Sequence, residues 1–153
     1  ILGRGKKALM IQFIKGPWKA GEDEFAARYG IPESQFQIKK MGLGFVGILG
    51  DQLPREEHQK AAQEALRYFR EERDSGKWDL IVLDEINVAI SLGLLTVQEV
   101  LEVIRDIPEN KLLLLTGRDA KQELIDRVDL ATEMRELKHP FNDGQLAKRG
   151  IEF

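Results

Sequence analysis

The sequence predicts an α/β fold: a three-layer sandwich in which a mainly parallel sheet lies between helices. Two observations carry this prediction. Apolar runs of strand length alternate with helical segments along the chain, and several of these runs stop abruptly at charged or polar residues. The 153 residues suit one domain, because a chain of about 150 residues removes roughly 70% of its unfolded surface from water.

The N-terminal part begins with the apolar run ALMIQFI (8–14), which predicts a buried strand ending at Lys15 and Gly16. A short helix is predicted over residues 23–29, with Gly30 as a left-handed cap and Pro32 just beyond it. A weaker strand over 36–38 precedes a flexible, apolar loop, MGLGFVGILGD (41–51).

A long helix is predicted from about Pro54 to Arg73, because proline suits a first helical position and an apolar stripe repeats along the segment. Its His58 lies among charged residues and is expected to be solvated. The stripe consists of Ala61, Ala62, Ala65, Leu66 and Phe69.

The C-terminal part begins with LIVL (80–83), a buried strand that runs into Asp84 and Glu85. TVQE (96–99) predicts a capping box that opens the next helix. LLLLT (112–116) predicts a fully buried strand, followed by a helix capped by Asp119 and packed through Leu124, Ile125 and Val128. A last strand is predicted over 132–137.

Composition excludes several classes of function. The chain contains 23 basic and 26 acidic residues, a net charge of −3, with no basic block that would predict nonspecific nucleic-acid binding. It contains no cysteine, so disulfides and thiol nucleophiles are excluded. No apolar run approaches about 20 residues and no secretory signal is recognisable. We therefore expect no nucleic-acid or membrane partner and a cytoplasmic location.

The residues that directly follow the strands are the first candidates for a functional site, because ligands collect at the carboxyl ends of parallel strands. An apolar strand ending in Asp84 and Glu85 matches a Walker B motif, whose carboxylate holds Mg²⁺ directly or through water. The alternative is an acidic pair that merely caps a strand, and the short motif alone does not decide between the two.

Lys15 and Arg118 follow neighbouring strands and can neutralise a polyphosphate, while Thr116 offers a polar contact. The alternatives are a surface lysine, a surface arginine and a simple strand end. The phosphate-binding motif G-x-x-x-x-G-K-[ST] is missing, and GRGKK (3–7) does not replace it because its spacing is wrong and a strand follows it.

Aromatic residues and His139 are weaker candidates. Trp18 and Phe45 lie in glycine-containing loops, where a large flat ligand could use them, although partial burial is the usual fate of such rings. His139 belongs to the turn KHPF (138–141), for which a structural role is the simpler interpretation.

Together these segments resemble the ATP:cob(I)alamin adenosyltransferases of the corrinoid pathway, which are built on a RecA-like P-loop nucleotide-binding fold. The resemblance runs in family order over essentially the whole chain. It is carried by GRGKKALMIQFIKG (3–16), GLGF (42–45), WDLIVLDEIN (78–87), LLLLTGRD (112–119), DLATEM (129–134) and KHPFNDGQLAKRGIEF (138–153).

In that family the counterpart of GRGKK lies after the P-loop and its helix. The resemblance therefore implies that residues 1–153 form a single adenosyltransferase domain whose first strand and P-loop are absent from this chain. We expect this segment to be missing from the sequence rather than lost by the protein, because the first strand would occupy the middle of the sheet and its loss would expose a large apolar edge.

The resemblance also implies a reaction. Cobalt(I) of a reduced corrinoid, such as cob(I)alamin, attacks the ribose 5′ carbon of ATP and releases triphosphate, with Mg²⁺ stabilising the leaving group. No hydrolytic water is needed, so Glu85 would be a catalytic magnesium ligand rather than a general base. Asp84 beside it would be a second catalytic ligand or would support the first. Nucleotide contacts are expected from Lys15, Gly16, Thr116 and Arg118.

The corrinoid is expected near Phe45 and Gly44, with Asn87 and His139 in its vicinity. Phe45 matches an aromatic residue that lies against the corrinoid and helps to hold off its lower ligand. Many relatives have a tryptophan two positions later, where this sequence has Gly47; Val46, Ile48 or Leu49 would have to compensate.

Two other functions remain open on the sequence. A RecA-like ATPase or kinase would use Glu85 to activate water or a hydroxyl group, and a nonenzymatic corrinoid- or nucleotide-binding module would lack a P-loop altogether. For the adenosyltransferase, the resemblance implies a homodimer and an electron-donating flavoprotein reductase as partners.

Overall fold

The computed structural model describes residues 1–47 and 50–146. It contains a four-stranded, all-parallel sheet with strand order β2-β1-β3-β4, which confirms the predicted α/β class. In chain order the elements are β1 (Ala8–Gln12), α1 (Gly21–Arg28), β2 (Phe36–Lys40), α2 (Arg55–Asp74), β3 (Leu80–Asp84), α3 (Ile86–Ser91), α4 (Val97–Ile104), β4 (Leu112–Leu115) and α5 (Gln122–Ile125), with short 3₁₀ turns at Leu2–Arg4 and Pro140–Asp143.

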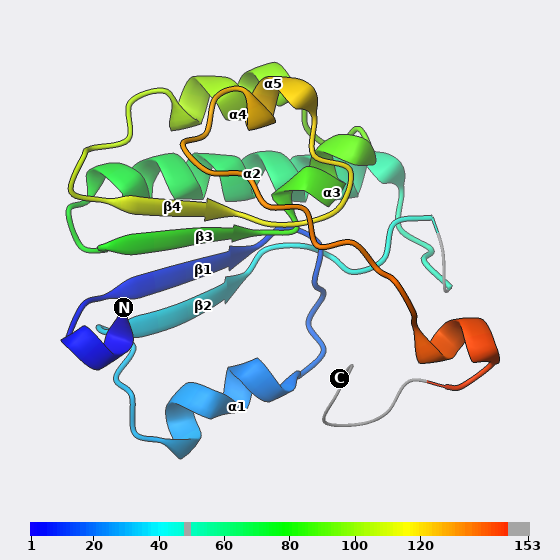
Figure 1. Ribbon diagram of the computed structural model, residues 1–153, viewed down its shortest axis with the longest axis horizontal. Helices are drawn as coiled ribbons and strands as arrows, with labels where there is room; N and C mark the ends of the chain where they lie inside the picture. Colours follow the sequence, from blue (N-terminus) through cyan, green and yellow to red (C-terminus); the bar gives the residue numbers. More distant parts are fainter. Residues whose placement is uncertain (48–49, 147–153) are drawn as a thin grey trace.

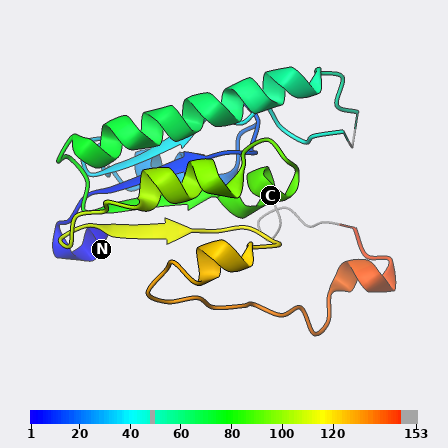
Figure 2. The ribbon, with the colours of Figure 1, turned by 90° about the horizontal axis from the view of Figure 1, so that it is seen from above.

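The helices form layers on both faces of the sheet. Helices α2 and α4 lie side by side over one face, whereas α1 lies on the other (Figure 1; Figure 2 views the α2 and α4 layer from above). The main core lies between the sheet and α2 and α4. Alternate strand residues enter it, including Leu9 and Ile11 of β1 and Leu83 of β3, all fully buried.

Two predicted helices form for the expected reasons. Thr96 Oγ1 accepts a hydrogen bond from Glu99 N at 3.2 Å, and the Glu99 carboxylate accepts one from Thr96 N at 2.7 Å, so the capping box at the start of α4 is confirmed. Helix α2 begins at Arg55, one residue after Pro54, and buries the predicted stripe through Ala62, Ala65, Leu66 and Phe69.

The prediction of a solvated His58 is wrong. His58 is only 3% exposed, and its Nε2 lies 3.1 and 3.2 Å from the two carboxylate oxygens of Asp51. The same carboxylate accepts hydrogen bonds from Gly47 N at 2.8 Å and Leu53 N at 3.0 Å. Asp51 thus links Gly47 and Leu53 to His58 in the first turn of α2.

The strand predicted over 132–137 is also wrong. These residues belong to no strand, and they run along an exposed, irregular segment away from the sheet (Figure 1). Met134 is 95% exposed and Leu137 is 87% exposed. The loose alternation of polar and apolar residues in this segment has no neighbouring strand to pair with among the described residues, so it does not produce a strand.

Two predictions around β4 need correction. Leu112 and Leu114 are 56% and 51% exposed, so β4 is not fully buried: it lies at the edge of the described sheet, and those two leucines point away from the α2 and α4 layer. Asp119 does not cap a helix. Its φ is +60°, it accepts a hydrogen bond from Ser91 Oγ, and the short α5 begins after Lys121.

Candidate functional site

The carboxyl ends of the four parallel strands carry polar residues, and these ends lie along one side of the sheet, which we call the sheet edge. In the parallel register, Gln12 of β1 lies between Lys40 of β2 and Asp84 of β3, and Thr116 follows β4. Its backbone N donates to Leu83 O at 3.1 Å, which continues the sheet to this point. Side chains more than 70 residues apart in sequence meet here for topological reasons alone.

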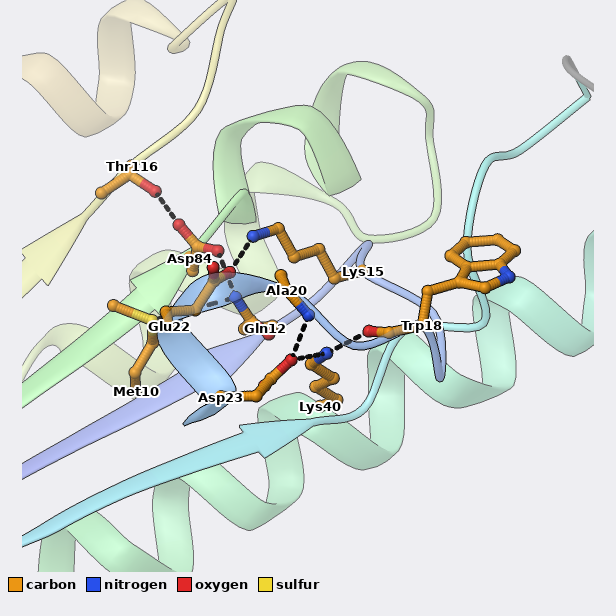
Figure 3. A network of polar contacts seen from close by, with 10 residues as sticks. All are labelled: Met10, Gln12, Lys15, Trp18, Ala20, Glu22, Asp23, Lys40, Asp84 and Thr116. Carbon is orange, nitrogen blue, oxygen red and sulfur yellow. Dashed lines mark hydrogen bonds and ion pairs between the residues drawn. The ribbon is translucent and has the colours of Figure 1, made fainter. Parts of the chain in front are cut away.

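Asp84 is held from both sides. Its Oδ1 accepts a hydrogen bond from Thr116 Oγ1 at 3.0 Å, and its Oδ2 accepts one from Gln12 Nε2 at 3.1 Å (Figure 3). Gln12 is 1% exposed and its Oε1 has no hydrogen-bond partner in the described structure. A carboxylate fixed in this way keeps a lone pair on each oxygen for a further ligand.

Glu85 directly follows and adopts a left-handed backbone conformation, with φ of +62°. Its backbone N donates to Thr116 Oγ1 at 3.0 Å, so the same hydroxyl group orders both acidic residues. Burial and the neighbouring Asp84 charge raise the pKa of the Glu85 carboxyl group, while Arg118 and Lys15 oppose this shift. Positive backbone φ at a non-glycine residue is uncommon and is often found at functional sites.

The residues at this edge fit a magnesium ion that is shared with a polyphosphate. No group of three or more acidic, histidine or cysteine side chains gathers in the described ranges, which excludes an all-protein cage there. Mg²⁺ does not require one, because it usually takes one or two carboxylates together with waters and phosphate oxygens. Asp84 and Glu85 could supply those carboxylates, and a bound cation would relieve the repulsion between them.

Lys15 and Arg118 flank this acidic pair, and both influence the Glu85 carboxyl group electrostatically. Lys15 Nζ forms an ion pair with Glu22 at the start of α1 (Figure 3). Burial raises the pKa of the Glu22 carboxyl group, but hydrogen bonds from Lys15 and from backbone outweigh burial and lower it overall. Arg118 is exposed and forms no ion pair within the described part of the chain.

The residues expected near the corrinoid separate into three places. Gly44 and Phe45 follow β2, at one end of the strand order. Asn87 is 8% exposed and lies at the other end, where its Nδ2 donates to Gly117 O at 3.4 Å and its N donates to Thr116 O at 3.2 Å. His139 accepts from Phe141 N within its own turn and makes no described hydrogen bond to the strand ends.

Gly16 and Gly44 allow the loops after β1 and β2 to approach. A Cβ on Gly16 would lie 3.1 Å from Gly44 Cα and 2.8 Å from the Trp18 ring. Gly47 has φ of +70°, and no described atom lies within 4 Å of a Cβ placed there. Ile48 and Leu49, which the sequence offered as compensation, lie outside the described residues, as does the GIEF ending.

Two residues of this site were not predicted from the sequence. Gln12 is the last residue of β1, and Glu22 belongs to the acidic first turn of α1. Gln12 could have been noticed as a polar residue inside an otherwise apolar run. Its contact with Asp84 depends on β1 lying beside β3, which the sequence order of the strands does not reveal.

Comparisons with known proteins identify the family of this chain. The family described as ATP:corrinoid adenosyltransferase BtuR/CobO/CobP matches residues 1–153. A corrinoid adenosyltransferase of Sinorhizobium sp. is 35% identical over 154 residues, which cover 99% of this chain and 69% of that protein.

Two further relatives carry the same name. The one from Pseudomonas aeruginosa is 36% identical over 152 residues, covering 99% of this chain and 72% of the relative. The one from Escherichia coli strain K12 is 29% identical over 152 residues, covering 99% and 74%. This chain belongs to the ATP:corrinoid adenosyltransferase family.

Proposed function

We propose that this protein transfers the 5′-deoxyadenosyl group of ATP to the cobalt(I) of a reduced corrinoid, in the synthesis or salvage of adenosylcobalamin. The cobalt electron pair forms the cobalt–carbon bond and cobalt(I) becomes cobalt(III). The bond between C5′ and its oxygen breaks, and triphosphate leaves with the electron pair of that broken bond. The reaction needs no water and no general base, which suits a site of carboxylates and cations.

The observation that best supports the proposal is the acidic pair at the end of β3. Asp84 and Glu85 are ordered by one hydroxyl group, that of Thr116, and would hold Mg²⁺. When bound, the metal would supply charge neutralisation for the departing triphosphate. Asp84 is the better oriented ligand, because Thr116 and Gln12 fix both of its oxygens.

The cations beside the acidic pair would bind the phosphates. Arg118 can donate two parallel hydrogen bonds to a phosphate. Lys15 would break its ion pair with Glu22 and bind the triphosphate instead. Its flexible side chain is 45% exposed at the end of the strand, which allows this movement. Gly16 and Thr116 would complete the nucleotide side of the site. Lys15 and Arg118 would contribute to the rate by stabilising the negative charge on the leaving group.

The corrinoid would lie on the side of Gly44 and Phe45. Phe45 is 47% exposed and would contact the macrocycle from below. Asn87 donates a hydrogen bond to the backbone of Gly117, just beyond β4. It would therefore act indirectly, by holding α3 against the segment that follows β4. For His139 the described contacts support only the ordering of its own turn.

The proposal extends to the rest of the protein. We infer a single domain completed by a first strand and P-loop. Leu112 and Leu114 are about half exposed on the sheet face away from α2 and α4, where that segment would cover them. We also infer a homodimer in the cytoplasm that receives electrons from a flavoprotein reductase. No helix among the described residues is long and apolar enough to cross a bilayer, and we propose neither a membrane nor a nucleic-acid partner.

The products of the reaction test the proposal. The full-length protein is mixed with ATP, Mg²⁺ and chemically reduced cobalamin, without oxygen. We expect the absorption spectrum of an alkylated corrinoid and one free triphosphate for each corrinoid consumed. Release of ADP and phosphate without alkylation would instead assign the site to an ATPase or kinase, and binding without turnover would indicate a nonenzymatic module.

A further inference from the structure

We propose that Trp18 binds the corrinoid substrate, forming with Phe45 one aromatic surface on which an apolar face of the corrin ring packs. The inference rests on the proposed function and adds a residue to it. Trp18 lies in the loop between β1 and α1, whereas Phe45 lies in the loop after β2. Their ring centroids are 5.9 Å apart and their planes are inclined by 33°.

Both rings are unusually open to solvent. Trp18 is 61% exposed and Phe45 is 47% exposed, although large aromatic side chains normally bury most of their surface. Two such rings in contact on the surface form an apolar patch from two separate loops. Contiguous exposed apolar patches of this kind mark binding sites more often than isolated exposed residues do.

Glycine residues hold the indole ring in place. A Cβ on Gly44 would lie 2.6 Å from the Trp18 ring, and a Cβ on Gly16 would lie 2.8 Å from it. The Trp18 ring therefore packs directly against the backbone of Gly16 and Gly44, where the Cβ of any other residue would clash with it. Gly44 also has φ of +109°, a conformation that residues with a side chain rarely adopt.

The backbone that carries Trp18 is fixed as well. The Trp18 carbonyl oxygen accepts a hydrogen bond from Lys40 Nζ, and Lys40 also forms an ion pair with Asp23 (Figure 3). The Lys40 and Asp23 side chains are only 18% and 21% exposed. Asp23 in turn accepts a hydrogen bond from Ala20 N at 2.7 Å. An exposed ring on a pinned loop is preorganised for a ligand.

Position along the sheet edge favours the corrinoid over ATP. Trp18 lies against Gly44, which follows the outer strand β2, while Thr116 follows β4 at the opposite end of the strand order. Lys15 and Asp84 lie between them (Figure 3). The two tilted rings offer a broad apolar surface, which suits a flat macrocycle. A purine would also require polar groups that read its edges.

Kinetics of Trp18 variants test this assignment in the full-length protein. For Trp18→Leu we expect the KM for cob(I)alamin to rise roughly ten-fold or more, because buried aromatic anchors dominate binding energy. The KM for ATP should stay unchanged, and Trp18→Phe should recover most of the loss. Since Trp18 is mostly exposed, both variants should fold, which circular dichroism and melting temperature would verify. An unchanged KM for cob(I)alamin would overturn the proposal.

Fluorescence gives a readout that does not depend on turnover. Of the two tryptophans in residues 1–153, Trp78 is 6% exposed and donates to Glu72, so acrylamide should quench Trp18 more strongly. The signal lost in Trp18→Phe isolates the Trp18 contribution. We expect saturating cob(II)alamin to shield Trp18 from acrylamide and Mg–ATP not to do so. Shielding by Mg–ATP alone would overturn the proposal.

The two readouts separate this proposal from the proposed function. If cob(II)alamin shields Trp18 but no adenosyl group is transferred, the aromatic site stands and the activity is refuted. If adenosyl transfer occurs while Trp18 stays open to acrylamide, the activity stands and the role of Trp18 is refuted.

Discussion

The two halves of the sheet edge differ in chemistry. Beyond β3 and β4, Asp84, Glu85 and Thr116 form a charged, hydrogen-bonded group. Beyond β1 and β2, Trp18 and Phe45 form an exposed aromatic surface. The difference teaches how one edge can serve two unlike substrates: a polyanion needs fixed charges and a metal, whereas a flat macrocycle needs apolar contact.

The halves also differ in how they are held. Side-chain hydrogen bonds across the strand register fix the polar half. Glycine residues and loop approach shape the aromatic half. Substitutions that remove charge or a hydroxyl group should therefore damage the nucleotide side, and substitutions that add a methyl group should damage the corrinoid side.

The largest effect is expected for Glu85→Gln. The substitution keeps the shape of the side chain and removes the charge that would bind Mg²⁺, so kcat should fall by on the order of 10²–10³. The rate of cobalt alkylation at saturating ATP measures this. Glu109→Gln is a matched control, because Glu109 is exposed in the loop before β4 and its substitution should change nothing. Full activity of Glu85→Gln would place the metal elsewhere.

A single added methyl group should affect the aromatic half. Gly44→Ala combines an unfavourable φ with a clash against the Trp18 ring, so we expect the KM for cob(I)alamin to rise roughly ten-fold. Gly47→Ala is the control, since Gly47 also has positive φ but open space around it. Equal effects of the two variants would attribute the loss to backbone strain rather than to the displaced ring.

Thr116→Val should affect the polar half more mildly. It preserves the branched shape but removes the donor to Asp84 and the acceptor for Glu85 N. The KM for Mg–ATP should rise by about three- to ten-fold, since hydrogen bonds to charged groups contribute roughly 1.5–3 kcal/mol and water can replace part of that. Thr116→Ser should restore it. A selective effect on cob(I)alamin would contradict the assignment of Thr116 to the nucleotide.

The smallest effect concerns stability without ligands. The pKa of Glu85 is raised above its ordinary value of 4.5 by burial and by Asp84, so its ionised form opposes folding. That cost is absent below pH 4.5, where Glu85 is protonated in both states, and complete above its folded pKa.

Metal-free Glu85→Gln should therefore melt a few degrees higher than the parent protein at neutral pH, with about 2–4 °C expected for each kcal/mol in a domain of this size. The difference should vanish near pH 4, below the ordinary pKa of 4.5. A variant less stable than the parent at neutral pH would show that the Glu85 charge is stabilised by contacts other than the metal.

Much of the fold could be predicted because its signals are local. The apolar stripe of α2, the capping box of α4 and the strand ending at Asp84 are each determined by nearby residues. The short helix α3 was missed because it starts directly after Glu85, whose left-handed conformation has no signature in the sequence. The strand predicted over 132–137 failed because strand formation requires a partner.

The candidate site could be predicted only in part, for a related reason. Asp84, Glu85, Thr116 and Lys15 follow apolar runs, which marks them as strand ends. The contacts of Gln12 with Asp84, Lys15 with Glu22 and Trp18 with Phe45 join different elements. These contacts depend on the order of the strands in the sheet and on how closely the loops approach one another. Neither property can be read from short segments of one sequence.

The central claim, that the edge is divided between two substrates, is tested most directly by equilibrium binding of each substrate alone. Mg–ATP and cob(II)alamin would each be titrated by calorimetry into Glu85→Gln and Trp18→Leu of the full-length protein. The predicted result is a crossed pattern, with Mg–ATP weakened only in Glu85→Gln and cob(II)alamin weakened only in Trp18→Leu. Equal weakening of both substrates by either variant would contradict the division.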